Sequence, residues 1–388
     1  MAERLKILFL TAWYPSQQAP LAGPFVREHA KAARVHDDVV VLHSAARDLG
    51  AGGFWKIEQE TDEALTEGIP TYRARARRLG PFSYVARLWG IEMAYRRIVA
   101  DGFRPDIIHA NVYPVGLPAV LLGRLHRTPT VLSEHSSEFQ RRALSPMRLA
   151  GARLAFQQAQ WVLPVSRSLQ QAIEAYGIRA RFLVVPNVVD TRLFRPGITP
   201  EEQAGTRVLL FIGSLDKDHK KGVPFLLQAL AQVGRQRSDW RLEVFGAGPA
   251  LAEYRQLSAE LGIGEKVGFR GPVSRREVAV QMQRCSFFVL PSLHETFGVV
   301  LIEALATGKP VLATLSGGPD EIVTPEVGLL VPPGDAGALA VAIDYLLDHY
   351  KEYLSSRLVS YVQQRFSYEA VGRQLDCVYR SMLIRGAR

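Results

Sequence analysis

Short apolar runs, rich in leucine and β-branched residues, alternate with longer stretches of helical pattern along nearly the whole chain. This alternation is typical of parallel sheets whose strands are joined by crossover helices. We expect an α/β protein with two doubly wound, Rossmann-like parallel-sheet domains that face each other across a cleft. The expected strands are 6–11, 39–44, 106–111, 129–136, 161–166 and 181–187 in the first half, and 207–215, 241–248, 267–273, 286–292, 309–316 and 328–333 in the second.

A polar segment, 190–206, separates the two sets of strands and contains two prolines and two glycines. Such a composition predicts a linker, so we expect one domain over 1–195 and another over 205–366. The closing helix, 367–388, is expected to pack back on the first domain. Ligands of doubly wound sheets bind beyond the carboxyl ends of the strands, where the strand order reverses. The candidate residues named below follow predicted strands.

The composition is that of a globular protein, with 388 residues, 47% of them apolar and 22% charged. No apolar run reaches the roughly 18 residues that cross a bilayer. Residues 1–13 carry charges and only a short apolar stretch, so we expect a first strand rather than a signal peptide. The only cysteines, Cys285 and Cys377, are interpreted as reduced core residues of a cytoplasmic protein. No Cys/His cluster in the sequence indicates zinc.

The net charge of +9 is unevenly distributed. Residues 1–200 contain 26 lysines and arginines against 17 acidic residues, whereas 201–388 contain 21 of each. The stretch 72–90 concentrates arginines among aromatic and aliphatic residues. It is interpreted as a solvated helix face, as a contact for an anionic membrane surface, or as a contact for an anionic acceptor. Nucleic acid is the least favoured partner, because no recognised binding module accompanies the charge.

The segment 295–308, ETFGVVLIEALATG, places two carboxylates in an otherwise apolar stretch, directly after a predicted buried strand. A helix that begins near Phe297 leaves its first amides free, and Gly298 has no side chain to block them, so an anion site is predicted. Glu295 precedes this site, and Glu303 lies about 12 Å further along if the segment is helical throughout. Two hydroxyl acceptors that flank an anion site suit a nucleotide sugar. The alternative is that Glu303 lies on the exposed face of an amphipathic helix.

Several segments in order along the chain resemble the retaining glycosyltransferases of the GT-B fold, in the family called family 4 or glycosyltransferase group 1. The family's E-x7-E motif matches Glu295 and Glu303 within PSLHETFGVVLIEALATGKPV. Each motif alone is weak, but their joint occurrence over nearly the whole chain is specific. The other matching segments are VVPNVVDTRLFRP (184–196), VSRSL (165–169), FGAGP (245–249) and the closing helix FSYEAVGRQLDCVYRSM.

The resemblance implies an N-terminal acceptor-binding domain and a second domain that binds a UDP- or GDP-sugar. It implies that Glu303 holds the ribose hydroxyls, that Glu295 holds the hydroxyls of the transferred sugar, and that His135 in LSEHSSEF hydrogen-bonds to that sugar near the reacting carbon. Gly23, in PLAGPFVREH, would let the backbone approach the phosphate, or it serves a simple turn. The residues expected to be catalytic are His135, Glu295 and Lys221. Those on the acceptor side are His109 and Asn111, and a local structural role is the alternative for His109. The residues expected to bind the donor are Gly23, Gly213, Ser214, Lys217, Lys221, Gly246, Glu295, Thr296, Phe297, Gly298 and Glu303.

One segment departs from the family pattern. Members of the family commonly carry Gly-Arg followed by Lys-Gly, whereas this chain has GSLDKDHKKG (213–222), with Ser214 at the arginine position and one extra residue. Lys221 keeps the lysine position. The second cation is Lys217, Lys220 or absent. Since a leaving diphosphate needs its charge neutralised, and lysine is a point charge where arginine is a bidentate fork, donor geometry or affinity is expected to differ from the family's.

The expected activity is metal-independent hexosyl transfer with no cofactor besides the nucleotide-sugar co-substrate. The D-x-D at 216–218, in GSLDKD, is lysine-rich and is interpreted as suited to phosphate directly rather than to a metal ion, and the resemblance also implies metal independence. A front-side route through an oxocarbenium-like state is favoured, since no carboxylate stands out as a covalent nucleophile. The expected acceptor is a sugar, a lipid-linked molecule or a polysaccharide, as in bacterial glycan synthesis. The expected location is the cytoplasm, at the inner face of the membrane if the basic residues 1–200 make contact there. A nucleotide-sugar epimerase of the same fold and an inactive binding relative remain the alternatives.

Overall fold

The computed structural model describes residues 3–19, 22–47, 54–77, 82–197 and 205–385. The chain divides into two compact units, which we call unit 1 (Met1–Val188 with Tyr368–Arg388) and unit 2 (Val189–Ser367). The chain therefore leaves unit 1 at Val188, several residues before the end of the domain expected from the sequence. Residues 198–204 of the expected linker lie outside the described residues.

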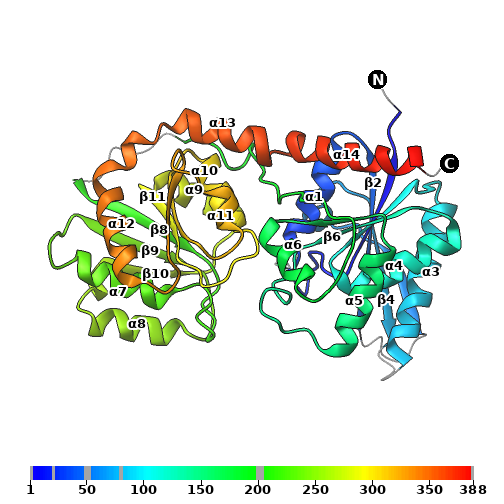
Figure 1. The fold of residues 1–388 in the computed structure, drawn as a ribbon, viewed down its shortest axis with the longest axis horizontal. Coiled ribbons are helices and arrows are strands. Elements are labelled where there is room, and N and C mark those ends of the chain that lie inside the picture. Colours follow the sequence, from blue (N-terminus) through cyan, green and yellow to red (C-terminus); the bar gives the residue numbers. More distant parts are fainter. Residues whose placement is uncertain (1–2, 20–21, 48–53, 78–81, 198–204, 386–388) are drawn as a thin grey trace. The chain divides into compact units, whose positions relative to one another are not determined.

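Unit 1 is built on a seven-stranded sheet with the order β3-β4-β2-β1-β5-β6-β7 (Figure 1). All neighbouring strands are parallel except β3 and β4. The strands are β1 Lys6–Thr11, β2 Asp38–Arg47, β3 Trp55–Gln59, β4 Thr71–Arg77, β5 Ile107–Asn111, β6 Thr130–Glu134 and β7 Trp161–Pro164. The helices are α1 Pro24–Arg34, α2 Glu63–Thr66, α3 Ser83–Ala100, α4 Gly116–His126, α5 Pro146–Gln158, α6 Arg167–Glu174 and α14 Tyr368–Arg385, with a 3₁₀ turn at Tyr113–Val115.

Unit 2 is built on a six-stranded, all-parallel sheet with the order β10-β9-β8-β11-β12-β13. In Figure 1, α7, α8 and α12 lie on one side of this sheet and α9, α10 and α11 on the other. The strands are β8 Arg207–Ile212, β9 Trp240–Phe245, β10 Val267–Gly271, β11 Phe287–Leu290, β12 Val311–Thr314 and β13 Gly328–Val331. The helices are α7 Val223–Val233, α8 Leu251–Glu260, α9 Arg275–Arg284, α10 Val299–Ala306, α11 Pro319–Ile322, α12 Ala336–His349 and α13 Ser355–Phe366, with 3₁₀ turns at Gly264–Lys266 and Tyr350–Glu352.

In both units the strand order reverses beside the first strand of the sheet: between β1 and β5 in unit 1, and between β8 and β11 in unit 2. A crevice at the carboxyl ends of the strands is the usual ligand site at such a reversal. The central strands are buried on both faces, as in Phe287–Leu290, whose four residues are all inaccessible. Strands covered on both faces form continuous apolar runs, which is why the sequence marks them clearly.

The stretch 72–90 is not one helix, contrary to the helical interpretation. Thr71–Arg77 form β4, residues 78–81 lie outside the described residues, and α3 begins at Ser83. The segment 181–187 is not a strand either, because only an isolated bridge joins Phe182 to Val162. Cys285 is buried as expected, but Cys377 is exposed, so it is not a core residue.

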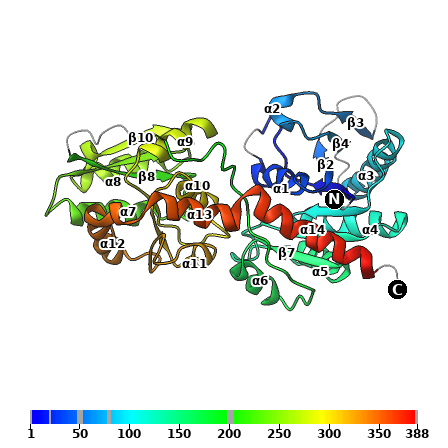
Figure 2. The ribbon, with the colours of Figure 1, turned by 90° about the horizontal axis from the view of Figure 1, so that it is seen from above.

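Helix α14 closes unit 1 by packing along α1, as Figure 2 shows from above. Val371, Leu375 and Tyr379 of α14 join the core formed with α1 and the sheet. The helices come so close that a Cβ on Gly372 would lie 2.2 Å from the carbonyl oxygen of Ala32. A side chain at this position would therefore force the two helices apart.

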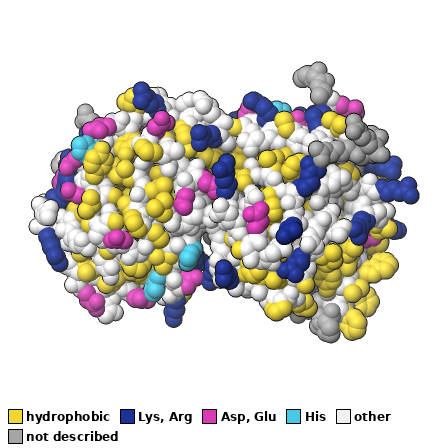
Figure 3. All heavy atoms as spheres, in the orientation of Figure 1, with side chains coloured by type: hydrophobic (Ala, Val, Ile, Leu, Met, Phe, Trp, Pro, Cys, Tyr) yellow, Lys and Arg dark blue, Asp and Glu magenta, His cyan; other side chains and the backbone are white. Residues whose placement is uncertain are grey.

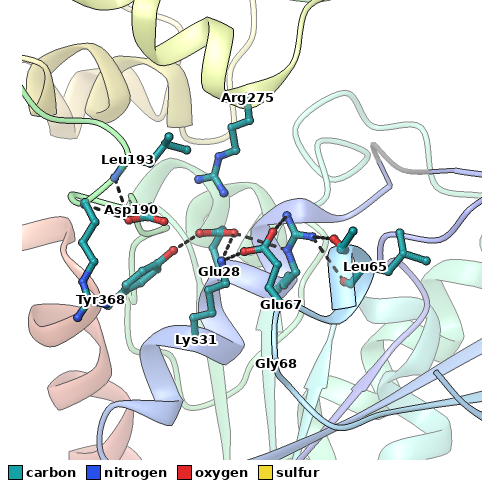
Figure 4. A network of polar contacts seen from close by, with 12 residues as sticks. Glu28, Lys31, Leu65, Glu67, Gly68, Asp190, Leu193, Arg275 and Tyr368 are labelled. Atoms are coloured by element: carbon teal, nitrogen blue, oxygen red, sulfur yellow. Dashed lines mark hydrogen bonds and ion pairs between the residues drawn. The ribbon is translucent and has the colours of Figure 1, made fainter. Parts of the chain in front are cut away.

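Charged side chains fix the start of α14 to α1 and α2. The Tyr368 hydroxyl donates to the buried Glu28, and Lys31 contacts both Glu28 and Glu67 (Figure 4). Arg27 adds an ion pair to Glu67 at 2.6 Å. Truncating one partner of such a network leaves another charge buried, which is more costly than losing the contact alone. The orientation of α1, and of the loop that precedes it, thus depends on the last helix of the chain.

Candidate active site

The loop between β8 and α7 carries Lys221, and the loop after β11 carries Glu295. The Lys221 ammonium donates to the Glu295 carboxylate at 2.5 Å, with the side chains 22% and 14% exposed. Backbone bonds hold the two loops in place: Leu293 N–H donates to the Lys220 carbonyl at 2.8 Å, and Glu295 N–H to the Ser316 carbonyl at 2.9 Å. Two residues that the sequence assigned to the site are thus directly paired at the strand-order reversal of unit 2.

Asp216 organises the rest of the β8–α7 loop. It accepts a hydrogen bond from the Ser214 hydroxyl at 2.6 Å and pairs with the Lys220 ammonium at 2.8 Å. Hydrogen bonds from Lys220 and Ser214 hold the pKa of the Asp216 carboxyl below its usual value. Lys217 is exposed at the tip of the loop. The charge of Lys220 is therefore already balanced, whereas the partner of Lys221 is itself a candidate ligand-binding residue.

The loops after β8 and β9 approach each other through two glycines. A Cβ on Gly246 would lie 1.8 Å from the Gly213 carbonyl oxygen, and Gly213 N–H donates to the Phe245 carbonyl at 3.0 Å. The need for glycine here therefore comes from backbone contact within unit 2, whether or not a ligand is bound. It brings Gly246 beside the loop that carries Lys221.

Helix α10 begins at Val299, with Gly298 as its N-cap at a left-handed φ of 92°. Thr296 and Phe297 precede the helix and are nearly buried, and Phe297 packs edge-on against Phe366 with ring centroids 5.9 Å apart. Among the described residues, no acceptor receives the N–H of Phe297 or Gly298. These amides suit an anion. Because residues 295–298 are not helical, the separation expected between the two glutamates from a continuous helix does not apply.

Glu303 lies on the second turn of α10 and is 7% exposed, so it is not on a solvated face. The Arg275 guanidinium is 3.7 Å from its carboxylate and lies over the Phe194 ring, 5.4 Å from the centroid. The sequence interpretation missed Arg275. A capping pattern, S-x-x-E at Ser274 and Glu277, marked the start of the helix that carries it, and Ser274 Oγ accepts from Glu277 N–H at 3.2 Å.

In unit 1, His135 follows β6 and lies in a cluster of buried rings. Its ring is 4.5 Å from Phe25 and 5.1 Å from His29, measured between centroids. The ring nitrogens of His135 and His29 are buried and make no well-aligned hydrogen bond to a described residue, although the Asn187 side chain lies close to both rings and the Pro186 carbonyl lies close to His29. Burial lowers the pKa of His135 well below its usual value and that of His29 to about 4, and these polar neighbours oppose the shifts. His135 is thus a neutral ring, and His29 and Asn187 are neighbours that the sequence did not indicate.

Glu134 fixes the backbone next to His135. Its carboxyl accepts from the N–H groups of His135 and Ser136 at 2.8 and 2.7 Å, and from that of Tyr113 at 2.8 Å. Burial raises the pKa of this carboxyl to about 7 even though the three N–H groups oppose the rise. The hydrogen bond from Tyr113 N–H lies beside Val112, whose φ of 65° is rare for a β-branched residue. Glu134 thereby ties together the ends of β5 and β6.

His109 and Asn111 do not line a surface of the described structure, contrary to the acceptor-side expectation. Both are fully inaccessible. His109 Nδ1 is 2.7 Å from the Tyr379 hydroxyl and Nε2 is 2.7 Å from the Ser133 hydroxyl, so both ring nitrogens are engaged. The Asn111 amide donates to the His109 carbonyl at 3.2 Å. The structure supports the local role for His109, as a link between the sheet and α14.

Gly23 is the N-cap of α1, with a left-handed φ of 64°. A Cβ there would lie 2.4 Å from the Trp13 carbonyl oxygen. The turn alone therefore requires glycine, and a role in phosphate approach stays a prediction. Two residues later, Phe25 in the first turn of α1 contacts His135, so the start of this helix reaches the histidine cluster.

The predicted residues thus fall into two groups, one in each unit. Unit 2 brings together the candidates after β8, β9 and β11, and unit 1 brings Gly23 near His135 through Phe25. Within the described part of the chain, no group of three His, Cys, Asp or Glu side chains has the geometry to hold a metal ion. The candidates in unit 2 are Gly213, Ser214, Lys217, Lys221, Gly246, Glu295, Thr296, Phe297, Gly298 and Glu303.

Comparison with known proteins identifies the family. Residues 22–188 match the profile described as a glycosyl transferase 4-like domain, and residues 199–365 match glycosyl transferases group 1. The D-inositol 3-phosphate glycosyltransferase 1 of Catenulispora acidiphila is 32% identical over 309 residues, 72% of each chain. The glycogen synthase of Mycobacterium tuberculosis is 26% identical and covers 89% of this chain and 86% of its own.

A solved structure shows the same fold. The Anabaena protein HepE, in complex with UDP, superposes with a TM-score of 0.76 at 23% identity, over 97% of this chain and 100% of that one. The chain belongs to the group 1 glycosyltransferases, family 4, and has the GT-B fold. The predictions of family and fold made from the sequence are confirmed.

Proposed function

We propose that this glycosyltransferase transfers a hexose, with retention and without a metal ion, from a UDP- or GDP-sugar to a hydroxyl acceptor. The observation that carries the proposal is the arrangement in unit 2, where Lys221, Glu295, the amides of Phe297 and Gly298, and Glu303 follow the strands at the order reversal. A cation and backbone N–H groups suit a diphosphate, and the two carboxylates suit sugar hydroxyls.

Each residue of unit 2 has a distinct task in this proposal. The amides of Phe297 and Gly298 and the Lys221 ammonium hold the diphosphate, Glu295 accepts from hydroxyls of the sugar, and Glu303 accepts from the ribose. Lys221 has three N–H donors, so it can contact a phosphate oxygen while it keeps its bond to Glu295. The Lys221–Glu295 pair thereby orients both side chains before the donor binds.

The reaction exchanges one bond at the anomeric carbon. The bond from this carbon to the phosphate oxygen breaks, the acceptor oxygen forms the new bond on the same face, and the acceptor proton passes to the leaving phosphate. Lys221 and the two amides stabilise the negative charge that grows on the leaving diphosphate, so no metal ion is needed for this task. His135 hydrogen-bonds through a neutral ring nitrogen to the transferred sugar, and Gly23 lets the loop after β1 approach the donor.

The named relatives leave the donor base and the acceptor open. HepE has been solved with UDP-glucose, and a Corynebacterium glutamicum relative is named as a GDP-mannose-dependent mannosyltransferase acting on a phosphatidylinositol monomannoside. This second name favours a lipid-linked acceptor, and the glycogen synthase name favours a polysaccharide. We place the enzyme in bacterial lipid-linked glycan or polysaccharide synthesis, in the cytoplasm at the membrane. No described helix has the length and apolar character needed to span a membrane.

Calorimetric titration with UDP, GDP and ADP, each with and without EDTA, tests the proposal. We expect one diphosphate to bind selectively and EDTA to leave its affinity unchanged. The matching sugar nucleotide is then incubated with candidate acceptors, and the anomeric configuration of the product is read by NMR. If no nucleotide binds, the replacement of arginine by Ser214 has removed donor use, and the protein is a binding relative. If a sugar nucleotide is interconverted without an acceptor, the protein is an epimerase.

Replacing Lys221 by alanine is expected to lower kcat/KM by about tenfold more than replacing Lys220, because a hydrogen bond to a charged group contributes about 1.5–3 kcal/mol. Lys220 is a matched control, since it neighbours Lys221 but is paired with Asp216. Steady-state kinetics of the two variants provide the comparison. Equal losses would show that the assignment of the lysines in the loop 213–222 is wrong.

A further inference from the structure

Helices α3 and α4 of unit 1 expose a set of large apolar side chains. Trp89 is 57% exposed and Leu125 is 64% exposed. Phe82, Val85 and Trp89 repeat at three- and four-residue spacing at the start of α3, and Leu121 and Leu125 are four residues apart on α4, so each set lies on one side of its helix. Figure 3 shows hydrophobic side chains gathering at the lower right, over the part of unit 1 where Figure 1 places α3 to α5. We call this surface the α3–α4 face; it comprises Phe82, Tyr84, Val85, Trp89, Leu121 and Leu125.

The α3–α4 face contains a groove of about 270 Å³, lined mainly by apolar side chains that include Trp89, Leu121 and Leu125. Arg96 lies at its edge and also lines a second hollow of about 420 Å³, where Arg104 and His126 are found. An apolar groove thus continues into a basic hollow through one shared arginine. This combination matches an amphiphile with an apolar part and an anionic head.

The charges around the face are predominantly positive. Arg96 and Arg97 have acidic partners on the same helix or at its end, Glu92 and Asp101. Arg104, Arg124 and Arg127 are exposed, and within the described residues no carboxylate lies within 4.0 Å of any of them. The net charge of +9 arises entirely from the first 200 residues, which include both helices. The face is therefore apolar at its centre and basic along its border.

We propose that the α3–α4 face docks on the surface of an anionic lipid bilayer, with Trp89, Leu121 and Leu125 at the boundary of headgroups and acyl chains and Arg104, Arg124 and Arg127 at the level of the phosphates. Tryptophan and tyrosine prefer this boundary, and exposed arginines are attracted to anionic lipids. The basic border distinguishes a bilayer from a second copy of the chain, because two copies meeting through this face would bring like charges together.

Arg73, of the arginine-rich strand β4, does not contribute to this membrane contact. The Arg73 side chain in that strand is 4% exposed and bonded to Glu60 at 2.5 Å, to His43 at 2.9 Å and to the Pro15 carbonyl at 2.7 Å. An arginine held in this way cannot reach a phosphate at a bilayer surface. The inference rests on the proposed function for its biological sense, but lipid binding is measured independently of donor binding.

Sedimentation with phosphatidylcholine vesicles, with and without phosphatidylglycerol, tests the inference. We expect the full-length protein to bind only the anionic vesicles, and salt to weaken the binding. The double variants Trp89→Ser with Leu125→Ser, and Arg104→Gln with Arg124→Gln, are each expected to lower the partition coefficient about tenfold or more. The matched control is Val341→Ser with Tyr345→Ser on α12, which also removes exposed apolar side chains but from unit 2, and it should bind like the wild type.

A second measurement follows the tryptophan fluorescence of the wild type and of Trp89→Phe. Lipids brominated on the acyl chain should quench the fluorescence of the wild type in anionic vesicles, and Trp89→Phe should remove most of that quenching. Nucleotide titration of every variant reports whether the donor site is intact, so failure of lipid binding and failure of the proposed function are distinguished. Unchanged partition of the Trp89 and Leu125 variant, or equal binding to neutral vesicles, overturns the inference. So does a wild-type dimer that this variant converts to monomers without any lipid binding.

Discussion

Replacing His135 by alanine is expected to lower kcat by about 10²–10³-fold and to change donor binding much less, because loss of one preorganised donor near the reacting centre has effects of this size. His135 directly follows the carboxyl end of β6, and the buried Glu134 fixes its backbone. Its ring nitrogens make no well-aligned hydrogen bond to a described residue, and the Asn187 side chain is the nearest polar neighbour. Such a ring keeps capacity to hydrogen-bond to a ligand.

The pH dependence gives this prediction a second readout. Burial, and then the charges of His29 and His109, lower the pKa of His135 well below 6.5. The ring is therefore neutral at pH 7, and it becomes charged only in more acidic solution, where activity through the neutral ring is lost. We expect kcat to show no inflection from His135 between about pH 6.5 and 8. Steady-state kinetics of His135→Ala over this range, with His349→Ala on α12 as the control, provide the measurement. A larger effect on donor affinity than on kcat would remove His135 from the reacting centre.

The sequence predicted the architecture of unit 2 closely, and the reason is physical. Five of the six expected strands contain the observed ones, and the sixth, 241–248, misses only Trp240 of β9, because buried parallel strands are apolar runs between turn residues. The E-x7-E segment was also informative, since it placed a carboxylate in the apolar stretch 299–306, although an exposed position for Glu303 remained the alternative. Glu303 is indeed buried near Arg275.

Unit 1 was less predictable where its stability depends on distant residues. Strand β4 alternates arginine with alanine, and an arginine is normally read as exposed. Arg73 is buried because Glu60, His43 and Pro15 supply partners from three other segments. Nothing near Arg73 in the sequence announces these partners. The same limit applies to His109, whose environment is completed by Tyr379, 270 positions away.

The candidate site shows the same division. Motif spacing located Lys221, Glu295, Gly298 and Glu303, which lie in short contiguous segments. His29, Asn187 and Arg275 come near the predicted residues only through the fold, although a capping signal at Ser274 marked the helix start that carries Arg275. Sequence reasoning therefore found the residues within motifs and missed the neighbours that set their environment.

Replacing Glu303 by alanine is expected to raise the donor KM at least about a hundredfold, since two hydrogen bonds from ribose hydroxyls to a carboxylate contribute about 1.5–3 kcal/mol each, and each 1.4 kcal/mol is a factor of ten. The position on α10 favours a binding role, because the side chain is nearly buried on an apolar helix and the Arg275 guanidinium is 3.7 Å from its carboxylate. A carboxylate has two oxygens with about four lone-pair sites, so it can accept hydrogen bonds from hydroxyls of a ligand beside its protein contacts.

The measurement is calorimetric titration of Glu303→Ala with the diphosphate and with the free nucleoside, beside steady-state kinetics. Loss of a ribose contact weakens both ligands by a similar factor, whereas loss of a phosphate contact weakens only the diphosphate. Glu303→Gln should fall between the alanine variant and the wild type, because an amide oxygen still accepts from a hydroxyl but carries no charge. Glu326→Ala, an exposed glutamate of the same unit, is the matched control. Unchanged donor affinity in Glu303→Ala would assign Glu303 to the structure of α10, as the partner that keeps Arg275 oriented over Phe194.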